Sequence, residues 1–248
     1  MLFHSYRTST GKPEPRLVTA RKPKVNWPIQ GRAVKTLNSV KALEEFGRTR
    51  LCQHFFMRDF LYSEISQAEG IPNVPERPDL AIEAGTQLCE RLLEPLQARF
   101  GRIAIRSGYR SAVVNAKGAE NGNQYNCASN EANAAHHIWD LPDMDGYLGA
   151  SVCIVVPALL DQYEKNGDWT PLAWWIHDHL PYSSQYWFPK LAAFNLGWRA
   201  NPQVRPSIRT YVANPHTGDR KALVKDGVAT LSPVERQTQV EAWLVSLG

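Results

Sequence analysis

The chain has 248 residues, of which 43% are hydrophobic and 21% charged, so it can bury one core of ordinary size. No segment approaches the roughly eighteen consecutive apolar residues of a membrane span, and the start lacks the apolar run of a signal peptide. We therefore expect a cytoplasmic protein without a membrane partner. The cysteines lack CxxC spacing, which argues against a zinc knuckle and indicates reduced thiols. They are Cys52, Cys89, Cys127 and Cys153.

Positive charge is concentrated at the N-terminus. Residues 1–50 hold eleven Lys or Arg against three Glu, whereas the other 198 residues carry four more acidic than basic side chains. Prolines and glycines interrupt residues 1–35, so the sequence predicts a basic extended arm over residues 1–36. Such an arm fits nucleic acid, an acidic partner or an anionic polymer, and its alternative interpretation is a solvated leader.

The first strong periodicity lies between residues 79 and 100. Apolar side chains recur four apart there and predict an amphipathic helix. They are Leu80, Ala84, Leu88, Leu92 and Leu96. Pro95 should end or bend that helix near its last turn. A strand is expected next, because Ile103 and Ile105 alternate with polar neighbours before the turn at Ser107-Gly108.

Further elements follow a long irregular segment, residues 112–148. A β-branched run predicts a strand over 149–157, and Gly167 ends a helix over 157–166. A second helix, 170–180, begins at Thr170-Pro171, and a strand is expected over 191–198. Ser232 and Glu235 have capping-box spacing, which predicts a final helix. The fold class is α+β, with a small antiparallel sheet and flanking helices.

Two segments in this order resemble a known family. They are QHFFMRDFLYSEISQAEGIPN, residues 53–73, and LCERLLEPLQARFGRIAIRSGYRS, residues 88–111. The chain resembles the zinc D-alanyl-D-alanine carboxypeptidases of the hedgehog/DD-peptidase fold, a family that includes phage endolysins, with a looser likeness up to Tyr211. The resemblance implies a family-like domain over residues 37–213, an insertion at about 138–148, and a C-terminal extension over 214–248 that carries the final helix.

The family's chemistry depends on two motifs. S-x-H-x-x-G-x-A-x-D supplies a histidine and an aspartate to zinc, and E-x-x-W-x-H supplies a general base and the third ligand. Three ligands leave one position for a water that attacks an amide carbonyl, while the glutamate moves its proton. By resemblance, Arg110 with Ser107 and Tyr109 binds substrate. His137 fits the first ligand position, with His136 beside it.

The remaining motif positions depart from the family pattern. Cys153 stands at the aspartate position, where a thiolate is a competent ligand but a small buried hydrophobe is the alternative. Asn195 stands at the third ligand and Lys190 near the general base; neither side chain performs the original task. The insertion contains three aspartates whose carboxylates are alternative metal ligands; the other interpretation is that they belong to a polar surface turn. They are Asp140, Asp143 and Asp145.

Two groups of side chains late in the chain have a structural and a functional interpretation. His177 and His179 offer metal ligands or favourable partners of a helix dipole. The aromatic residues between 169 and 198 form either a stacking platform or the packing between the sheet and its helices, and we favour packing. The packing interpretation concerns Trp174, Trp175, Trp187 and Phe194.

Together these features predict a repurposed, catalytically inactive member of the fold. It would bind a cell-wall peptide or a protein partner, or serve in a phage particle. One alternative is an active zinc peptidoglycan peptidase with a non-standard ligand set. The other is nucleic-acid binding through residues 1–35.

Overall fold

A seven-stranded sheet organises the computed structural model, which describes residues 37–120 and 125–247. The strand order is β1-β2-β4-β3-β5-β6-β7, and every neighbouring pair is antiparallel except β3 and β5, which are parallel. The fold class is therefore α+β with a mostly antiparallel sheet. The strands are β1 Ala104–Ser107, β2 Gly149–Val155, β3 Ser184–Trp187, β4 Phe194–Arg199, β5 Ser207–Thr210, β6 Val224–Lys225 and β7 Val228–Ala229.

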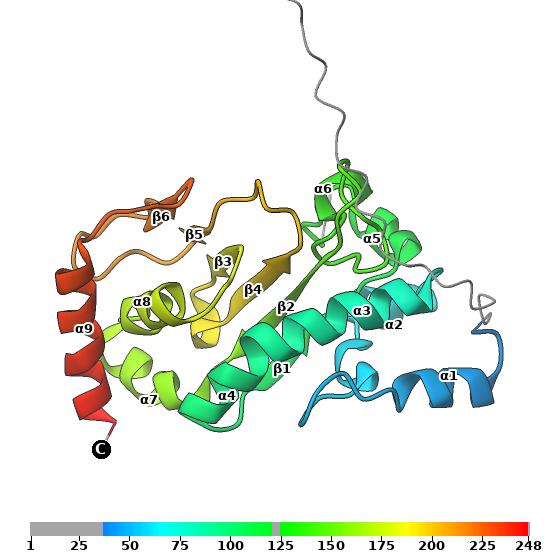
Figure 1. Ribbon diagram of the computed structural model, residues 1–248, viewed down its shortest axis with the longest axis horizontal. Helices are drawn as coiled ribbons and strands as arrows, with labels where there is room; N and C mark the ends of the chain where they lie inside the picture. The colour runs from blue at the N-terminus through cyan, green and yellow to red at the C-terminus, as the bar shows by residue number, and fades with distance from the viewer. Residues whose placement is uncertain (1–36, 121–124, 248) are drawn as a thin grey trace, which may run out of the picture. The chain divides into compact units, whose positions relative to one another are not determined.

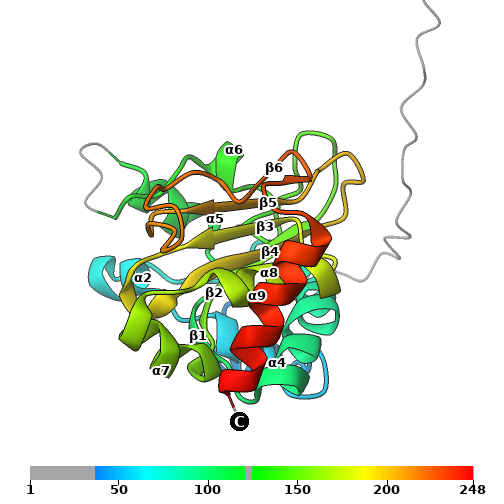
Figure 2. The same ribbon diagram turned by 90° about the vertical axis from the view of Figure 1, so that its left-hand side faces the viewer.

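Helices flank this sheet (Figure 1). They are α1 Val40–Gly47, α2 Glu64–Glu69, α3 Pro78–Leu88, α4 Glu94–Phe100, α5 Ala112–Gly118, α6 Asn130–Asn133, α7 Pro157–Asn166, α8 Thr170–His179 and α9 Pro233–Ser246. Short 3-10 turns cover Met57–Phe60 and Lys190–Ala192. Figure 2 looks onto α8 and α9, with the strands behind them. No helix in the described part of the chain is long and apolar enough to cross a bilayer.

One face of the sheet packs on α3 and α8, and we call it the helix face. The alternation of strand side chains sends Gln185 and Trp187 of β3 to this face, where the Gln185 amide donates to the Ala173 carbonyl of α8 at 3.1 Å. Trp187 stacks on Phe194 with ring centroids 4.0 Å apart. The aromatic residues expected to pack the sheet against its helices are buried, which confirms the packing interpretation for them.

The predicted helix over 79–100 forms, but Pro95 does not end it. Helix α3 continues into α4 through a π turn at Cys89–Leu93, in which the Glu94 N–H donates to the Cys89 carbonyl. Proline lacks an N–H and its ring crowds the carbonyl four residues earlier. The wider π turn just before Pro95, together with its place in the first turn of α4, accommodates both effects.

Local end signals predicted α7, α8 and α9, whereas α1, α2, α5 and α6 were not predicted. Helices α5 and α6 lie within residues 112–148, which were expected to be irregular. Helix α7 ends at Gly167, which has a φ of 71°, and α9 begins at the Ser232–Glu235 capping box, as predicted. The strand expected from residue 191 was wrong at its start: residues 190–192 form a turn with Leu191 at a φ of 60°, and β4 begins at Phe194. Strands β3, β5, β6 and β7 were not predicted.

The segment expected as an insertion, residues 138–148, begins inside the core. Trp139 is fully buried, and its indole N–H donates to the Ser151 carbonyl of β2 at 3.1 Å. Residues 214–248, expected as an extension, add β6, β7 and α9 to the same compact unit as the rest of the described chain. The basic arm, residues 1–36, lies outside the described residues.

Candidate functional site

The face of the sheet opposite the helix face carries a row of polar side chains, and we call it the polar face. The strand register aligns Ser107 with Cys153, Cys153 with Asn195, Asn195 with Tyr186, and Tyr186 with Arg209. Because strand side chains alternate, this row lies opposite Trp187 and Phe194. One row further along, Ser151 of β2 faces Gly197 of β4.

A loop that bears two histidines closes onto the polar face beside β2. The Ser151 N–H donates to the His136 carbonyl at 2.8 Å, and the Arg110 N–H donates to the His137 carbonyl at 2.8 Å. Gly149 permits this approach, since a Cβ there would lie 2.3 Å from the Ala135 carbonyl oxygen. The sequence therefore positions His136 and His137 through backbone contacts on both sides.

His137 is buried and makes the central contacts of the site. Its Nδ1 lies 3.3 Å from the Gly108 carbonyl oxygen, which only accepts, so Nδ1 carries the proton and Nε2 presents a lone pair. The amide nitrogen of Asn195 faces that Nε2 at 3.5 Å. Burial, and to a smaller extent Arg110, lowers the pKa of His137 to about 4.

His136 lies among positive charges. Its Nδ1 is 3.1 Å from the Ser151 hydroxyl, and its ring meets that of His137 edge to face at 4.6 Å. Burial, followed by His137 and by the guanidinium groups of three arginines, holds the pKa of His136 well below its usual value. These arginines are Arg199, Arg209 and Arg110. Both histidines are thus neutral at pH 7, and the positive charge of the site comes from arginine.

The residues expected to bind substrate divide into two groups. Arg110 is anchored, because its guanidinium donates to Asn115 Oδ1 at 3.1 Å and to Cys127 Sγ at 2.9 Å. Ser107 lies in the polar row next to Cys153. Tyr109 does not reach the polar face: it is 1% exposed, and its hydroxyl donates to Asp140 Oδ1 at 3.0 Å. The substrate-binding role assigned to Tyr109 is corrected to a structural one.

Asp140 is not a surface-turn residue. It is buried, and its Oδ2 accepts the backbone N–H groups of Glu76 and Arg77 at 2.9 and 3.2 Å. This carboxylate joins the segment before α3 to the core through Tyr109. Its expected alternatives, a metal ligand or a solvated turn, give way to an internal hydrogen-bonding role.

Asp143 and Asp145 do belong to a turn. Asp143 accepts the backbone N–H groups of Asp145 and Tyr147, and both carboxylates accept from the Asn201 amide, at 3.1 and 3.4 Å. They fasten this turn to the segment after β4.

Three other proposed participants lie away from His137. Lys190 is exposed in the turn between β3 and β4. His177 accepts or donates at Tyr182 Oη, 2.8 Å away, and His179 Nδ1 donates to the Trp175 carbonyl, also at 2.8 Å. Both histidines belong to α8, on the helix face.

Cys153 combines a polar neighbour with an apolar surrounding. It lies across from Asn195, but it packs with Val155, Ala193 and Phe188. Burial raises the pKa of its thiol to about 11. Within residues 37–120 and 125–247, no three His, Cys, Asp or Glu side chains are grouped as metal ligands.

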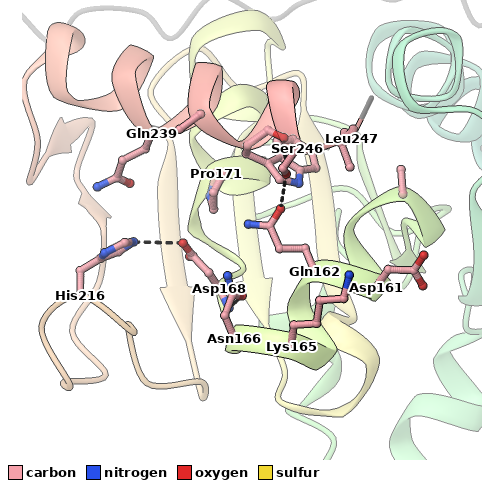
Figure 3. Close-up of a pocket in the computed structure, with 13 residues that line it drawn as sticks. Asp161, Gln162, Lys165, Asn166, Asp168, Pro171, His216, Gln239, Ser246 and Leu247 are labelled. Carbon is pink, nitrogen blue, oxygen red and sulfur yellow. Dashed lines mark hydrogen bonds and ion pairs between the residues drawn. The ribbon is translucent and has the colours of Figure 1, made fainter.

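A separate cavity of about 520 Å³ lies between α7, the start of α8, α9 and residue 216 (Figure 3). Asp168 and His216 approach one another there, with Oδ2 and Nε2 3.1 Å apart, and Ser246 donates to Gln162 Oε1 at 3.0 Å. These groups partner each other. None of the residues predicted for the functional site lines this cavity.

Sequence reasoning missed Ser151, Arg199 and Arg209. The signal for Ser151 and Arg199 was present in the two-residue alternation of their strands, because Ser151 shares a parity with Cys153 and Arg199 with Asn195. Arg209 required knowledge of the parallel β3–β5 pairing, which no local pattern indicates.

Compared with models of protein families, with curated proteins and with solved structures, the chain has no match.

Proposed function

We propose that this chain is a non-hydrolytic relative of the zinc D-alanyl-D-alanine carboxypeptidases that uses its polar face to bind the carboxylate of a peptide ligand. The order of elements supports the relationship: a long helix, a strand, the SGYRS segment, a histidine loop and then central antiparallel strands. The fold assignment to the hedgehog/DD-peptidase class is part of the proposal.

The contact between His137 and Asn195 carries the proposal. In the family pattern these two positions hold zinc together, whereas here the Asn195 amide nitrogen faces the His137 lone pair that a metal would use. An asparagine amide is a poor zinc ligand, and the protonated Cys153 thiol lies among apolar side chains. This donor set does not fit a hydrolytic zinc site, so we derive no metal-dependent step.

The arginines supply the attraction for an anion. Arg199 is largely withdrawn from water, and burial lowers its pKa from the usual value. The negative charge of Asp143 raises that pKa in part, but the Asp143 carboxylate already accepts a hydrogen bond from the Asn201 amide. A bound carboxylate would compensate the buried guanidinium and would form charge-assisted hydrogen bonds. Neutral histidines beside it add donors and acceptors without adding charge.

The first experiment measures zinc in the full chain purified without a histidine tag. We expect no stoichiometric zinc in the natural sequence, and we expect Asn195→His to gain zinc that a further His137→Ala change removes. Asn38→His, which alters an exposed asparagine before α1, is the matched control and should gain none. One zinc per chain in the unaltered protein would overturn the proposal in favour of an active hydrolase. Failure of Asn195→His to gain zinc would contradict the family register.

The second experiment measures binding of diacetyl-L-Lys-D-Ala-D-Ala and of its C-terminal amide by calorimetry. The free acid should bind without being cleaved, and the amide should bind about tenfold more weakly because it lacks the charge. Arg199→Gln should weaken binding of the acid by a similar factor, whereas Arg102→Gln, at an exposed arginine before β1, should not. Equal binding of acid and amide, or cleavage of the peptide, would refute the proposal.

A further inference from the structure

Three aromatic side chains gather on the polar face beside Asn195, and we call them the aromatic cluster: Tyr186, Phe188 and Tyr211. The ring of Tyr186 lies 5.4 Å from that of Phe188 and 5.1 Å from that of Tyr211, both edge to face. Phe188 and Tyr211 are 6.0 Å apart. Burial, followed by a hydrogen bond with Tyr211, raises the pKa of Tyr186 to about 12. The three rings therefore form one connected surface.

This surface differs from the aromatic core because part of it faces solvent. Tyr211 is 56% exposed, whereas Trp187, on the opposite face of the same strand as Tyr186, is fully buried. Exposed aromatic rings that contact one another beside a polar site are typical of ligand-binding surfaces. Tyr211 is held in place by its backbone N–H, which donates to the Trp187 carbonyl at 2.9 Å.

An arginine completes the arrangement. The guanidinium of Arg209 lies 5.3 Å from the centre of the Tyr186 ring, so it covers that ring and leaves Tyr211 as the exposed one. Arg209 also acts on His136, together with Arg199. The guanidinium of Arg209 and the ring of Tyr211 thus both adjoin the ring of Tyr186, so one ligand can contact both. Tyr186 pairs with Asn195 and with Arg209 in the strand register.

We propose that the aromatic cluster and Arg209 form a subsite for an acidic saccharide, with a sugar ring packed on Tyr211 and its carboxylate paired with Arg209. The inference rests on the proposed anion binding at the polar face and specifies a ligand class for it. A sugar ring presents C–H groups to an aromatic face and hydroxyl groups to the tyrosine oxygens. The carboxylate matches the charge of Arg209.

A single-stranded nucleic acid fits these features less well. Residues 51–248 carry four more acidic than basic side chains, so a long polyanion meets net repulsion from the body while a single carboxylate meets the local arginines. In addition, the three ring pairs of the aromatic cluster stand at 88°, 70° and 33°, so no two rings are parallel.

Calorimetry on the full chain with cellobiouronic acid, and with cellobiose as its uncharged counterpart, tests the subsite. We expect the acid to bind at least tenfold more tightly than cellobiose, and both Tyr211→Leu and Arg209→Gln to weaken the acid about tenfold. Tyr62→Leu is the matched control, because Tyr62 has the same 56% exposure outside the strands of the polar face, and Arg205→Gln is the control for charge. Neither control should change binding.

Three results would overturn the subsite: no binding of cellobiouronic acid, binding that Tyr211→Leu and Arg209→Gln leave unchanged, or tighter binding of a thymidine oligonucleotide that depends on Tyr211. The peptide experiment separates this failure from failure of the proposed function. If the peptide acid binds through Arg199 while the disaccharide does not, only the subsite is wrong. If neither ligand binds, the proposed function also fails.

Discussion

Tyr186 and Trp187 are neighbours on strand β3, but they enter opposite environments. Trp187 stacks on Phe194, contacts the ring of Trp169 at 5.1 Å and donates its N–H to Gln185 at 3.0 Å on the helix face. Tyr186 lies on the polar face among Arg209, Asn195 and two partly exposed aromatic rings. The helix face is organised by burial, whereas the polar face is organised by hydrogen bonds and charge.

The two faces also differ in how their polar side chains are partnered. On the helix face the polar side chains partner one another or the backbone, as Gln185 does with Ala173. On the polar face, Arg199 is partly buried and the carboxylate that acts on it, Asp143, also accepts from the Asn201 amide, while His137 directs its lone pair at an amide. Unbalanced charge and unusual pairing are typical of binding sites, while the balanced face provides stability.

The largest expected effect is that of Trp187→Ala. Removing this fully buried ring should lower the free energy of unfolding by about 4 kcal/mol, because it deletes apolar burial and leaves a cavity beside Phe194. Tyr186→Ala, one residue earlier, should cost about 1 kcal/mol, since part of its ring already faces solvent. Urea unfolding at equilibrium measures both. Equal losses of unfolding free energy would show that Tyr186 is packed as tightly on the polar face as Trp187 is on the helix face.

The sequence predicted the helices and strands that have local signals. It predicted site residues only where they lie on or beside those elements. Gly167 and the Ser232–Glu235 box marked helix ends correctly, and the β-branched run of β2 marked a strand. Strands β3 and β5 were missed because each has only four residues and neither shows a hydrophobic alternation. In β3 one of the two buried side chains is the polar Gln185, and in β5 Ile208 is the one apolar residue. Their burial depends on partners far along the chain, which local patterns do not contain.

The same limit explains the errors at individual residues. Asp140 looked like part of a solvated turn because its partners, Tyr109 and the backbone at residues 76 and 77, are 31 or more residues away in sequence. Pro95 looked like a helix end because the compensating π turn has no sequence signature of its own. In contrast, the Asn195 amide nitrogen lies 3.5 Å from His137 Nε2, two positions that the resemblance described above had placed together.

The second prediction concerns acid. In the unfolded chain a histidine takes up a proton near pH 6.5, but folded His137 does so only near pH 4. Between these values the unfolded state binds more protons, so the free energy of unfolding falls as the pH drops from 6.5 to 4, by about 3 kcal/mol from this residue. The contribution of His137 to stability is complete above pH 6.5 and is lost progressively as the pH falls to 4.

His137→Gln should therefore reduce the loss of stability between pH 6.5 and pH 4, as followed by urea unfolding at several pH values. Part of the loss should remain, because the pKa of His136 is also lowered. His216→Gln removes a histidine from the cavity near α9 and should leave most of the slope in place. An unchanged slope in His137→Gln would mean that His137 takes up its proton in the folded state as readily as in the unfolded one, and the neutral pair on the polar face would then be wrong.

The third prediction is that Asp140→Ala lowers the free energy of unfolding by about 2 kcal/mol, less than Trp187→Ala does. The change leaves the buried Tyr109 hydroxyl and two backbone N–H groups without their acceptor, and unsatisfied buried donors are costly. Asp145→Ala, in the exposed turn a few residues later, should cost less than about 0.5 kcal/mol. If Asp140→Ala lowers the free energy of unfolding no more than Asp145→Ala does, Asp140 is a surface-turn residue and its internal hydrogen-bonding role is wrong. The predicted loss instead means that the Asp140 carboxylate, near the histidine loop, is held by internal hydrogen bonds that stabilise the fold and is not free to accept a proton from a ligand.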